Sequence, residues 1–284
     1  MPLVAGAELL QDAKRRKYAV PQFNVLNLEM VEAVIETASS LHAPVIVGIV
    51  DRHFPVLDVE SLVFAVKQRA QRASVPVVLH LDHGRTWERV IEALRYGFTS
   101  VMFDGSLLPL EENIAISRDI VKVAHAVHVS VEAELGHVGS SKTGDHNEAT
   151  SVNEAVYFVE QTGVDYLAIS IGNTHGHYQG QAPTFDMQIL REINSRVNVP
   201  LVLHGGSETP VEEIRRVIDN GIAKINIFTE FARAYMEGIV DLSQSATIDY
   251  LNVASRGKEK AKETIITKLN DFNTTGQQAV FQNT

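Results

Sequence analysis

Two apolar stretches of the chain end in residue types that can carry out chemistry. Residues 77–84 end with Asp82, His83 and a glycine, and residues 200–206 end with His204 and two glycines. Runs of aliphatic and β-branched residues are typical of strands that are buried on both faces. Because side chains alternate along a strand, we expect Asp82 and His83 to point to opposite faces, and to have separate tasks, if the strand continues through them. The two stretches together predict a site built from strand ends.

Polar residues also follow other apolar stretches at the point where each stretch ends. The complete set is Asn24, Asp82, His83, Asp104, Glu134, His175, His204 and Asn226. Taken singly, each has an ordinary structural explanation. The Asp104-Gly105 pair is typical of a turn, His204 before glycine could be a cap, and one of Glu132 and Glu134 could be a solvated edge residue. So many polar residues at strand ends favour a functional site over chance.

Three histidines, His83, His175 and His204, follow different predicted strands in a chain without cysteine. Such a set is typical of a catalytic metal site with three histidine ligands and one open position. Zinc is the natural ion for imidazole ligands, and cobalt and manganese are the alternatives. His175 and His177 compete for one of the three positions.

The ends of two predicted strands each lead into a predicted helix. These ends are residues 204–207, which contain two glycines, and residues 226–229. Backbone N–H groups at strand-to-helix turns bind phosphate. In barrel enzymes the phosphate site typically lies after the seventh and eighth strands, which is where these segments fall. The residues by themselves therefore predict a metal ion and a phosphorylated substrate.

The elements that must position these residues alternate along the chain. The predicted strands are residues 18–24, 44–50, 76–83, 100–105, 129–136, 166–172, 200–206 and 223–229. The predicted helices are residues 7–17, 27–41, 56–73, 86–96, 109–126, 152–162, 185–195, 210–220, 230–240 and 254–269. Strict alternation favours a parallel sheet, and eight units favour one (β/α)8 TIM barrel over a doubly wound sheet. We expect a single domain over residues 1–284, with an extra C-terminal helix at about 254–269 and a loose tail at 274–284.

Composition excludes several classes of protein. The formal net charge of −10 argues against a nucleic-acid-binding protein, which usually has a basic face. No apolar run approaches the roughly 20 residues that cross a bilayer, and residues 1–17 lack the apolar block of a signal peptide. The absence of cysteine excludes disulfides and thiol nucleophiles and fits a cytoplasmic location. Any metal ligands must therefore be His, Asp or Glu.

Seven short motifs occur together in one order. They are Pro21-Gln22-Phe23-Asn24, Leu79-His80-Leu81-Asp82-His83-Gly84, Ser100-Val101-Met102-Phe103-Asp104-Gly105-Ser106, Val131-Glu132-Ala133-Glu134-Leu135-Gly136, Gly172-Asn173-Thr174-His175-Gly176, Leu203-His204-Gly205-Gly206-Ser207 and Lys224-Ile225-Asn226. Over nearly the whole chain this set resembles the class II, zinc-dependent fructose/tagatose-bisphosphate aldolases. The resemblance implies reversible cleavage of a ketose 1-phosphate or 1,6-bisphosphate to dihydroxyacetone phosphate and an aldehyde, by a homodimer or homotetramer.

The resemblance also assigns roles to the polar residues. His83, His175 and His204 would hold the catalytic zinc, and the family pattern selects His175 over His177 because glycine follows it directly. Positions that hold a second divalent ion in some members are occupied by Asp104 and Glu134. The positions that match substrate-binding residues, mostly for dihydroxyacetone phosphate, are Asn24, Gly176, Gly205, Ser207, Asn226 and Thr229.

The implied chemistry explains these residue types. Cleavage between C3 and C4 leaves an enediolate, whose charge a chelating zinc ion stabilises as a Lewis acid. No Schiff-base lysine is then needed, and the end of the sixth strand, residues 169–172, contains none. Asp82 would protonate the aldehyde oxygen in condensation and take that proton back in cleavage. We expect Lys224 to be structural.

The loop after the fifth predicted strand departs from the family pattern. Lys142 stands where most members carry the glutamate that moves the enediol proton. Asp145 or Glu148 could be the loop base in its place, because the loop is polar. The alternative for either residue is an ordinary solvated surface position.

The distal half of the site departs as well. Ile266 stands where members that act on bisphosphates usually carry an arginine, and the loss of such a clamp is not conservative. Arg52, Arg85 or Arg256 could replace it, with a surface position as the alternative. The second strand ends at Asp51, where many members have serine. The pattern predicts a retained dihydroxyacetone phosphate half, an altered aldehyde half and a ketose 1-phosphate without a second phosphate.

Two other functions remain open from the residues. One is a non-catalytic accessory subunit of a sugar-phosphate aldolase, which the missing loop glutamate allows but the retained histidines and Asp82 disfavour. The other is a barrel metallohydrolase, which usually has a His-x-His pair on its first strand. Here that strand ends in Phe23-Asn24.

Overall fold

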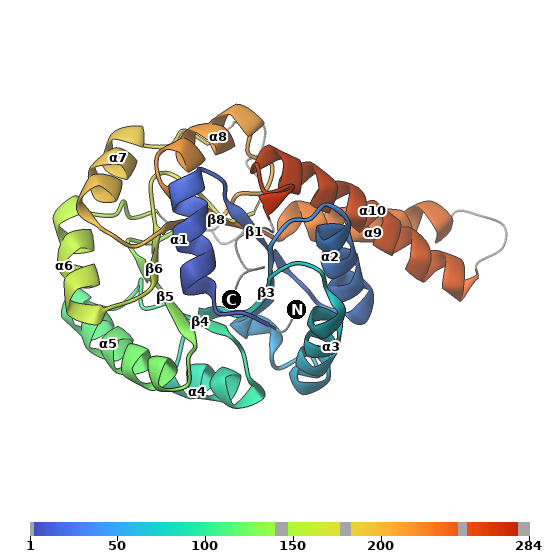
Figure 1. The fold of residues 1–284 in the computed structure, drawn as a ribbon, viewed down its shortest axis with the longest axis horizontal. Helices are drawn as coiled ribbons and strands as arrows, with labels where there is room; N and C mark the ends of the chain where they lie inside the picture. Colours follow the sequence, from blue (N-terminus) through green and yellow to red (C-terminus); the bar gives the residue numbers. More distant parts are fainter. Residues whose placement is uncertain (1–2, 140–146, 177–182, 244–248, 278–284) are drawn as a thin grey trace.

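Eight parallel strands close into a barrel in chain order (Figure 1). The computed structural model describes residues 3–139, 147–176, 183–243 and 249–277. The strands are β1 (Val20–Asn24), β2 (Val45–Val50), β3 (Val77–Gly84), β4 (Ser100–Phe103), β5 (Ser130–Leu135), β6 (Tyr166–Ile169), β7 (Leu201–Leu203) and β8 (Ile222–Ile227). Closure is visible at Gln22, which pairs with Ile46 on one side and Asn226 on the other. The predicted (β/α)8 barrel is confirmed.

Helices connect consecutive strands and surround the barrel (Figure 1). They are α1 (Gly6–Arg16), α2 (Leu28–Ser40), the 3-10 helix η1 (Asp51–His53), α3 (Val59–Arg72), α4 (Trp87–Tyr96), α5 (Leu110–Ala126), α6 (Val152–Thr162), α7 (Met187–Arg196), α8 (Val211–Asp219), α9 (Thr229–Ser243) and α10 (Tyr250–Asp271). Several begin at side chains that accept hydrogen bonds from first-turn N–H groups, as Asn27 does from Met30 and Thr86 from Arg89. These caps fix where each loop gives way to a helix.

Helix α1 closes the amino end of the barrel. Its buried Leu9 and Leu10 pack with barrel-interior residues such as Val20 and Ile46. A separate apolar cluster fills the space between the strands and the outer helices. Because α1 covers one end, the carboxyl ends of the strands form the open mouth, where loops can build a site.

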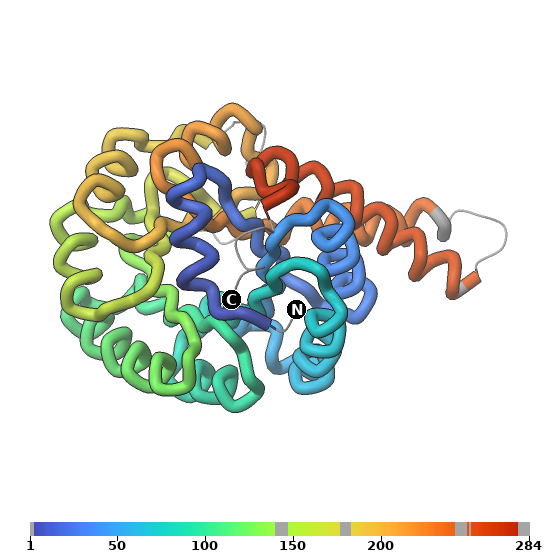
Figure 2. Tube along the Cα trace, in the orientation of Figure 1, coloured from blue at the N-terminus to red at the C-terminus, as the bar shows by residue number. Residues whose placement is uncertain are grey.

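The C-terminal helix is longer than predicted and lies beside α9. The two helices project from the barrel as a pair (Figures 1 and 2), and α10 begins at Tyr250 and ends at Asp271. Lys258 joins α10 to α2 through Glu32 at 2.8 Å and Glu36 at 2.9 Å. These ion pairs tie the base of the projecting pair to the barrel.

The segment expected to be a loose tail starts with packed residues. Thr274 is fully buried and its hydroxyl donates to the carbonyl oxygen of Ala19 at 2.6 Å. Gly276 donates its N–H to the carbonyl of Leu41 at 3.0 Å. The expected tail is therefore wrong for these residues, and residues 278–284 lie outside the described part of the chain. Within the described ranges, no helix has the length and apolar character needed to cross a membrane.

Candidate active site at the barrel mouth

The end of β3 is irregular, and this irregularity positions two site residues. The pairing of β3 with β4 shifts register between Leu81 and Gly84. His83 has a φ of 52°, a left-handed conformation that is uncommon for a residue with a side chain. Such a bulge re-aims side chains, and Asp82 and His83 both line the same cavity. The expectation that they point to opposite faces is wrong.

A cavity of about 470 Å³ occupies the mouth of the barrel. Its lining includes all the residues predicted to bind substrate, which are Asn24, Gly176, Gly205, Ser207, Asn226 and Thr229. It also includes Asp82, His83, Asp104, Glu134 and His175. The tertiary structure therefore gathers the predicted strand-end residues around one space, except His204, which is fully buried and does not line the cavity.

The three predicted metal ligands lie next to one another. The ring centroids of His83 and His204 are 4.6 Å apart, those of His83 and His175 are 5.0 Å apart, and those of His175 and His204 are 5.7 Å apart. Each ring offers a nitrogen within 4.8 Å of the others. His204 directly follows β7 and is fully buried. His177 lies outside the described residues.

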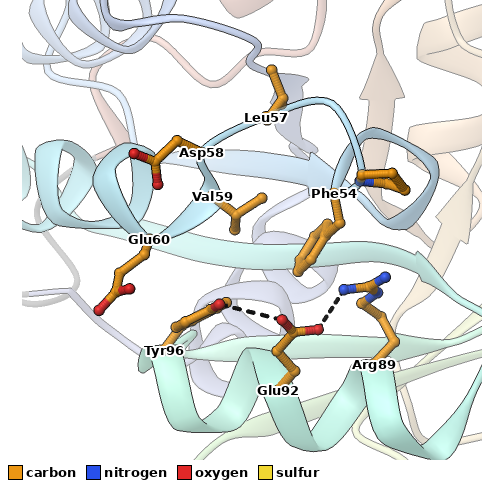
Figure 3. A pocket seen from close by; sticks show the side chains of 9 residues that line it. Phe54, Leu57, Asp58, Val59, Glu60, Arg89, Glu92 and Tyr96 are labelled. Carbon is orange, nitrogen blue, oxygen red and sulfur yellow. Dashed lines mark hydrogen bonds and ion pairs between the residues drawn. The ribbon is translucent and has the colours of Figure 1, made fainter.

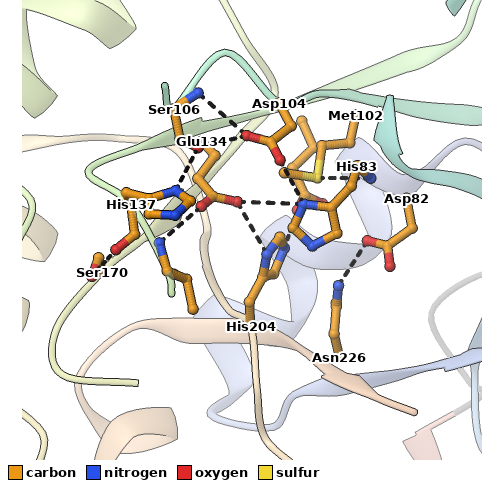
Figure 4. Close-up of polar contacts among 12 residues, drawn as sticks. Asp82, His83, Met102, Asp104, Ser106, Glu134, His137, Ser170, His204 and Asn226 are labelled. Atoms are coloured by element: carbon orange, nitrogen blue, oxygen red, sulfur yellow. Dashed lines mark hydrogen bonds and ion pairs between the residues drawn. The ribbon is translucent and has the colours of Figure 1, made fainter. Parts of the chain in front are cut away.

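Two carboxylates face the same histidines, as Figure 4 shows. Asp104 Oδ2 lies 2.9 Å from His83 Nδ1, and Glu134 Oε2 lies 3.8 Å from the same nitrogen. His83, Asp104 and Glu134 form a second group whose ligand atoms lie within 4.8 Å of one another. The residues expected to hold a second ion are thus brought together beside the first group.

The electrostatics of this cluster fit a bound cation. His204 Nδ1 and Glu134 Oε2 are buried without a hydrogen-bond partner and lie 3.2 Å apart. Burial alone would lower the pKa of His204, but the hydrogen bond to Glu132 and the adjacent Glu134 carboxylate outweigh it and raise that pKa to about 10. Burial, with His83 and His204 nearby, lowers the pKa of His175 well below its usual value, so its ring is neutral at pH 7. Neutral imidazole and carboxylate are both metal ligands.

Asp82 is held by two amide groups. Asn24 Nδ2 donates to one carboxylate oxygen at 2.8 Å, and Asn226 Nδ2 donates to the other at 2.9 Å (Figure 4 shows the second contact). Gln22 in turn donates to Asn24 Oδ1 at 3.1 Å. Burial would raise the pKa of Asp82, but the charges of His83 and His204 outweigh it and hold that pKa below its usual range. The carboxylate is therefore ionised and fixed in orientation.

The sequence did not predict the buried ion pair of Glu132 and Lys224, which lies next to His204. Glu132 accepts a hydrogen bond from His204 Nε2 at 3.0 Å and another from Lys224 Nζ at 2.7 Å. Burial would raise the pKa of Glu132, but Lys224 outweighs it and lowers that pKa to about 2. All three side chains are fully buried. Neither Glu132 nor Glu134 is a solvated edge residue, and charged residues inside apolar strands were the available signal.

The loop after β5 is pinned at its base. His137 and Glu148 exchange two backbone hydrogen bonds of 2.9 Å. The Glu148 side chain is exposed and is not part of the cavity lining among the described residues. Ser106 Oγ donates to Asp104 Oδ1 at 2.7 Å and lies 3.2 Å from His137 Nδ1 (Figure 4). Lys142 and the proposed base Asp145 fall outside the described residues.

Two of the three candidate arginines lie at the mouth. Arg52 and Arg85 line the cavity, and the Arg52 guanidinium carbon lies 5.9 Å from the centroid of the Phe228 ring. Arg256 is exposed on α10. Ile266 is 42% exposed on the same helix, away from the described cavity lining. Arg52 and Arg85 therefore reach the site, whereas Arg256 is not part of the described cavity lining.

Asp51 braces the segment that carries Arg52. One of its carboxylate oxygens accepts from Arg85 N at 3.0 Å, and the other accepts from Arg89 Nε at 2.7 Å. Arg89 lies 4.2 Å from the Phe54 ring centroid and also pairs with Glu92 beside a small surface pocket (Figure 3). Asp51, which stands where many family members have serine, thus connects η1 to α4.

The fold and the site together define a barrel protein with a three-histidine group at its mouth. Comparison with known proteins agrees with this description. The family model described as fructose-bisphosphate aldolase class-II matches residues 4–277. The chain therefore belongs to the class II fructose-bisphosphate aldolase family, and it is a lyase of the aldolase type.

Individual relatives cover nearly the whole chain. The 6-phospho-5-dehydro-2-deoxy-D-gluconate aldolase of Halalkalibacterium halodurans is 40% identical, with 98% of each chain covered. The fructose-bisphosphate aldolase of Geobacillus stearothermophilus is 37% identical, over 98% of this chain and 100% of the relative. Among solved structures, the YdjI aldolase of Escherichia coli K12 superposes with a TM-score of 0.88 at 33% identity, covering 97% of this chain and 99% of that one.

Proposed function

We propose that the protein is a metal-dependent aldolase that cleaves a ketose 1-phosphate between C3 and C4 and releases dihydroxyacetone phosphate and an aldehyde. The observation that carries this proposal is the convergence of His83, His175 and His204 in one group, two of whose members line the same cavity as Asp82. The three histidines would hold zinc, and Asp104 with Glu134 would hold a second divalent ion. When bound, the catalytic ion supplies a Lewis acid that stabilises negative charge on substrate oxygens.

Asp82 takes the proton from the C4 hydroxyl as the C3–C4 bond breaks, and returns it to the aldehyde oxygen in condensation. The two amide hydrogen bonds at 2.8 and 2.9 Å support this role, because they hold the carboxylate at the cavity wall. Asn24 and Asn226, expected to contact substrate, thereby also orient the proton acceptor. A positioned acid–base group needs such a fixed orientation to act efficiently.

The phosphate of dihydroxyacetone phosphate binds at the strand ends after β7 and β8. Gly205 has a φ of 69°, and a Cβ there would lie 2.3 Å from the Thr174 carbonyl oxygen, so only glycine fits this turn. Ser207 lines the cavity, and so does Thr229 at the start of α9. Helix N-termini and exposed backbone N–H groups favour phosphate.

The far end of the substrate carries a carboxylate in place of a second phosphate. Arg52 and Arg85 at the mouth support an anionic group, since guanidinium binds carboxylate through two hydrogen bonds. The relative that is 40% identical is named for 6-phospho-5-dehydro-2-deoxy-D-gluconate. That compound has a keto carbon beside its phosphate, as a ketose 1-phosphate has, and a carboxylate at the other end. Its carbons are numbered from the carboxylate, so the hydroxyl that gives up its proton, on C4 of a ketose 1-phosphate, is the one on C3 of this compound.

Metal analysis and an aldol-cleavage assay with and without chelator test the reaction class. The proposal expects bound zinc and a loss of cleavage on chelation that zinc restores. A metal-free protein that cleaves nothing by itself would instead favour the accessory subunit. Hydrolysis of an ester or amide without aldol cleavage would favour the metallohydrolase.

A substrate panel tests the distal group. We expect kcat/KM to be highest for 6-phospho-5-dehydro-2-deoxy-D-gluconate, lower for fructose 1-phosphate and lowest for fructose 1,6-bisphosphate. Much faster turnover of the bisphosphate would contradict the carboxylate assignment and leave the aldolase assignment intact. The homodimer or homotetramer and the cytoplasmic location stay predictions, which sedimentation and cell fractionation can check.

A further inference from the structure

A pair of opposite charges is buried in the barrel next to the three-histidine group. Lys224 on β8 and Glu132 on β5 are both fully buried, with Lys224 Nζ 2.7 Å from Glu132 Oε2. Taking two charges out of water is costly, and an ion pair offsets this cost only partly. An apolar pair would fill the same space without that cost. The pair is therefore better explained by what it contacts than by stability.

The contact that matters is the one to His204. Glu132 Oε1 lies 3.0 Å from His204 Nε2, while His204 Nδ1 faces Glu134 Oε2 at 3.2 Å. A neutral imidazole carries one N–H, and the nitrogen without it can bind a metal. A carboxylate accepts hydrogen bonds and does not donate them. Glu132 thus requires the N–H of His204 at Nε2, which leaves Nδ1 for the ion.

We propose that Lys224 and Glu132 form a positioning pair that locks His204 in its Nε2–H form and turns Nδ1 toward the metal. The inference rests on the proposed metal binding and extends it from the ligands to the residues that hold them. Lys224 touches neither the ion nor the substrate and acts through Glu132. Groups that orient a metal-bound histidine in this way commonly change metal affinity 10- to 100-fold when they are removed.

The position of Lys224 explains why a carboxylate alone does not suffice. Near Glu132 Oε2 lie the Lys224 ammonium and His80 Nε2, the latter at 3.6 Å. His80 is itself held through Nδ1, 2.6 Å from Ser100 Oγ. The hydrogen bond from Lys224 fixes Oε2, so that Oε1 stays directed at His204. Without the ammonium, Oε2 loses this hydrogen bond and the carboxylate is free to rotate away from His204.

Two single variants and their combination test the pair. Glu132→Gln keeps the shape, but its amide must direct NH2 either at His204 Nε2–H or at Lys224, and both are donors. Lys224→Met keeps the length and removes the charge. In the double variant the amide oxygen can face His204 while NH2 faces the methionine. We expect each single variant to weaken zinc and cobalt binding about 10- to 100-fold, and the double variant to lose less than the product of the two.

The measurement is metal affinity, by competition with a chromogenic chelator, together with the visible spectrum of the cobalt form. Denaturant unfolding of the metal-free proteins separates loss of fold from loss of affinity. The matched control is Lys258→Met, which removes a lysine–carboxylate pair of 2.8 Å on the outer helices and is expected to leave metal affinity unchanged. If the wild type binds metal and all variants bind it equally well, the positioning pair is disproved and the proposed function stands. If the wild type binds no metal, the proposed function fails and the inference fails with it.

Discussion

At the scale of single residues, the site depends on which protonation state each side chain holds. Asp82 is ionised between Asn24 and Asn226, while His204 carries a proton stabilised by Glu132 and Glu134 when no metal is bound. His175 is neutral beside it. Asp82, His204 and His175 thus have three different electrostatic environments, and each environment follows from named neighbours.

Replacing Asp82 tests its role in proton transfer. Asp82→Asn keeps the volume but cannot take the proton from the C4 hydroxyl, so kcat for cleavage should fall by about 10² to 10⁴. Metal content measured on the same preparation should equal that of the wild type. A variant with full metal content and near-normal kcat would remove Asp82 from the mechanism.

Metal binding should depend on pH in a direction set by His204. Its pKa of about 10 in the metal-free protein means that the ring is protonated at pH 7 to 9. The ion must displace that proton, so the zinc association constant should rise about tenfold or more for each pH unit in this range. Competition titrations at several pH values measure the slope. A flat or falling profile would show that His204 does not lose a proton on binding.

Arg52 provides the residue-scale test of substrate choice. Arg52→Ala should raise KM about 10- to 100-fold for a substrate that ends in a carboxylate, because it removes hydrogen bonds between charged groups. KM for fructose 1-phosphate should change little. Arg256→Ala is the control, since Arg256 is exposed on α10. Equal effects of Arg52→Ala on both substrates would argue against a carboxylate partner.

At the scale of elements, short connections decide where side chains point. The bulge at the end of β3 turns Asp82 and His83 into one cavity, and the Asp51 brace joins η1 to α4. Neither feature is a regular helix or strand. The bulge depends on pairing between β3 and β4, and the brace depends on a contact between segments that follow β2 and β3.

The Asp51 brace can be loosened without touching the metal site. Asp51→Asn weakens the contact to Arg89 Nε at 2.7 Å, so η1 should hold Arg52 less firmly. The expected result is a roughly five- to tenfold higher KM, from the loss of one charged hydrogen bond, with unchanged metal affinity. Glu92→Gln is the matched control, because Glu92 also pairs with Arg89 but does not contact η1. Equal KM in Asp51→Asn and the wild type would refute the brace.

At the scale of the whole molecule, the barrel is closed at one end and open at the other. Helix α1 packs its apolar face against the barrel interior, and the mouth at the opposite end carries the polar residues. Thr274 brings the segment after α10 back to Ala19, the residue before β1. Stability and chemistry are thereby placed at different ends, as is general in this architecture.

This separation predicts a variant that loses stability but keeps the site. Leu9→Ala leaves a cavity at a fully buried position in the barrel interior. The free energy of unfolding should fall by about 2–5 kcal/mol in denaturant titrations. Metal bound per folded chain should be unchanged. A parallel loss of metal affinity at low temperature would mean that the closed end and the mouth are coupled.

Sequence alone was sufficient for the barrel and for the family. Strand and helix patterns are local, and a barrel brings every strand end to one mouth whatever the details of packing. The elements therefore fell close to their predicted positions, the predicted metal ligands lie next to one another, and the predicted substrate-binding residues line one cavity. The expected tail failed at Thr274 because burial of that residue depends on β1, far away in the chain.

Tertiary structure decided the features that depend on closure of the barrel. The bulge that aligns Asp82 with His83 is set by pairing with β4. The contacts of Glu132 with His204 and Lys224 join residues 72 and 92 positions apart, so no local pattern reveals them. Likewise, only the folded structure shows that Arg52 and Arg85 line the cavity and that Arg256 is not among its described lining residues. The sequence by itself determined which residue types with chemical potential stand at the strand ends. Only folding decided which other side chains orient those residues, because orientation depends on neighbours from other strands.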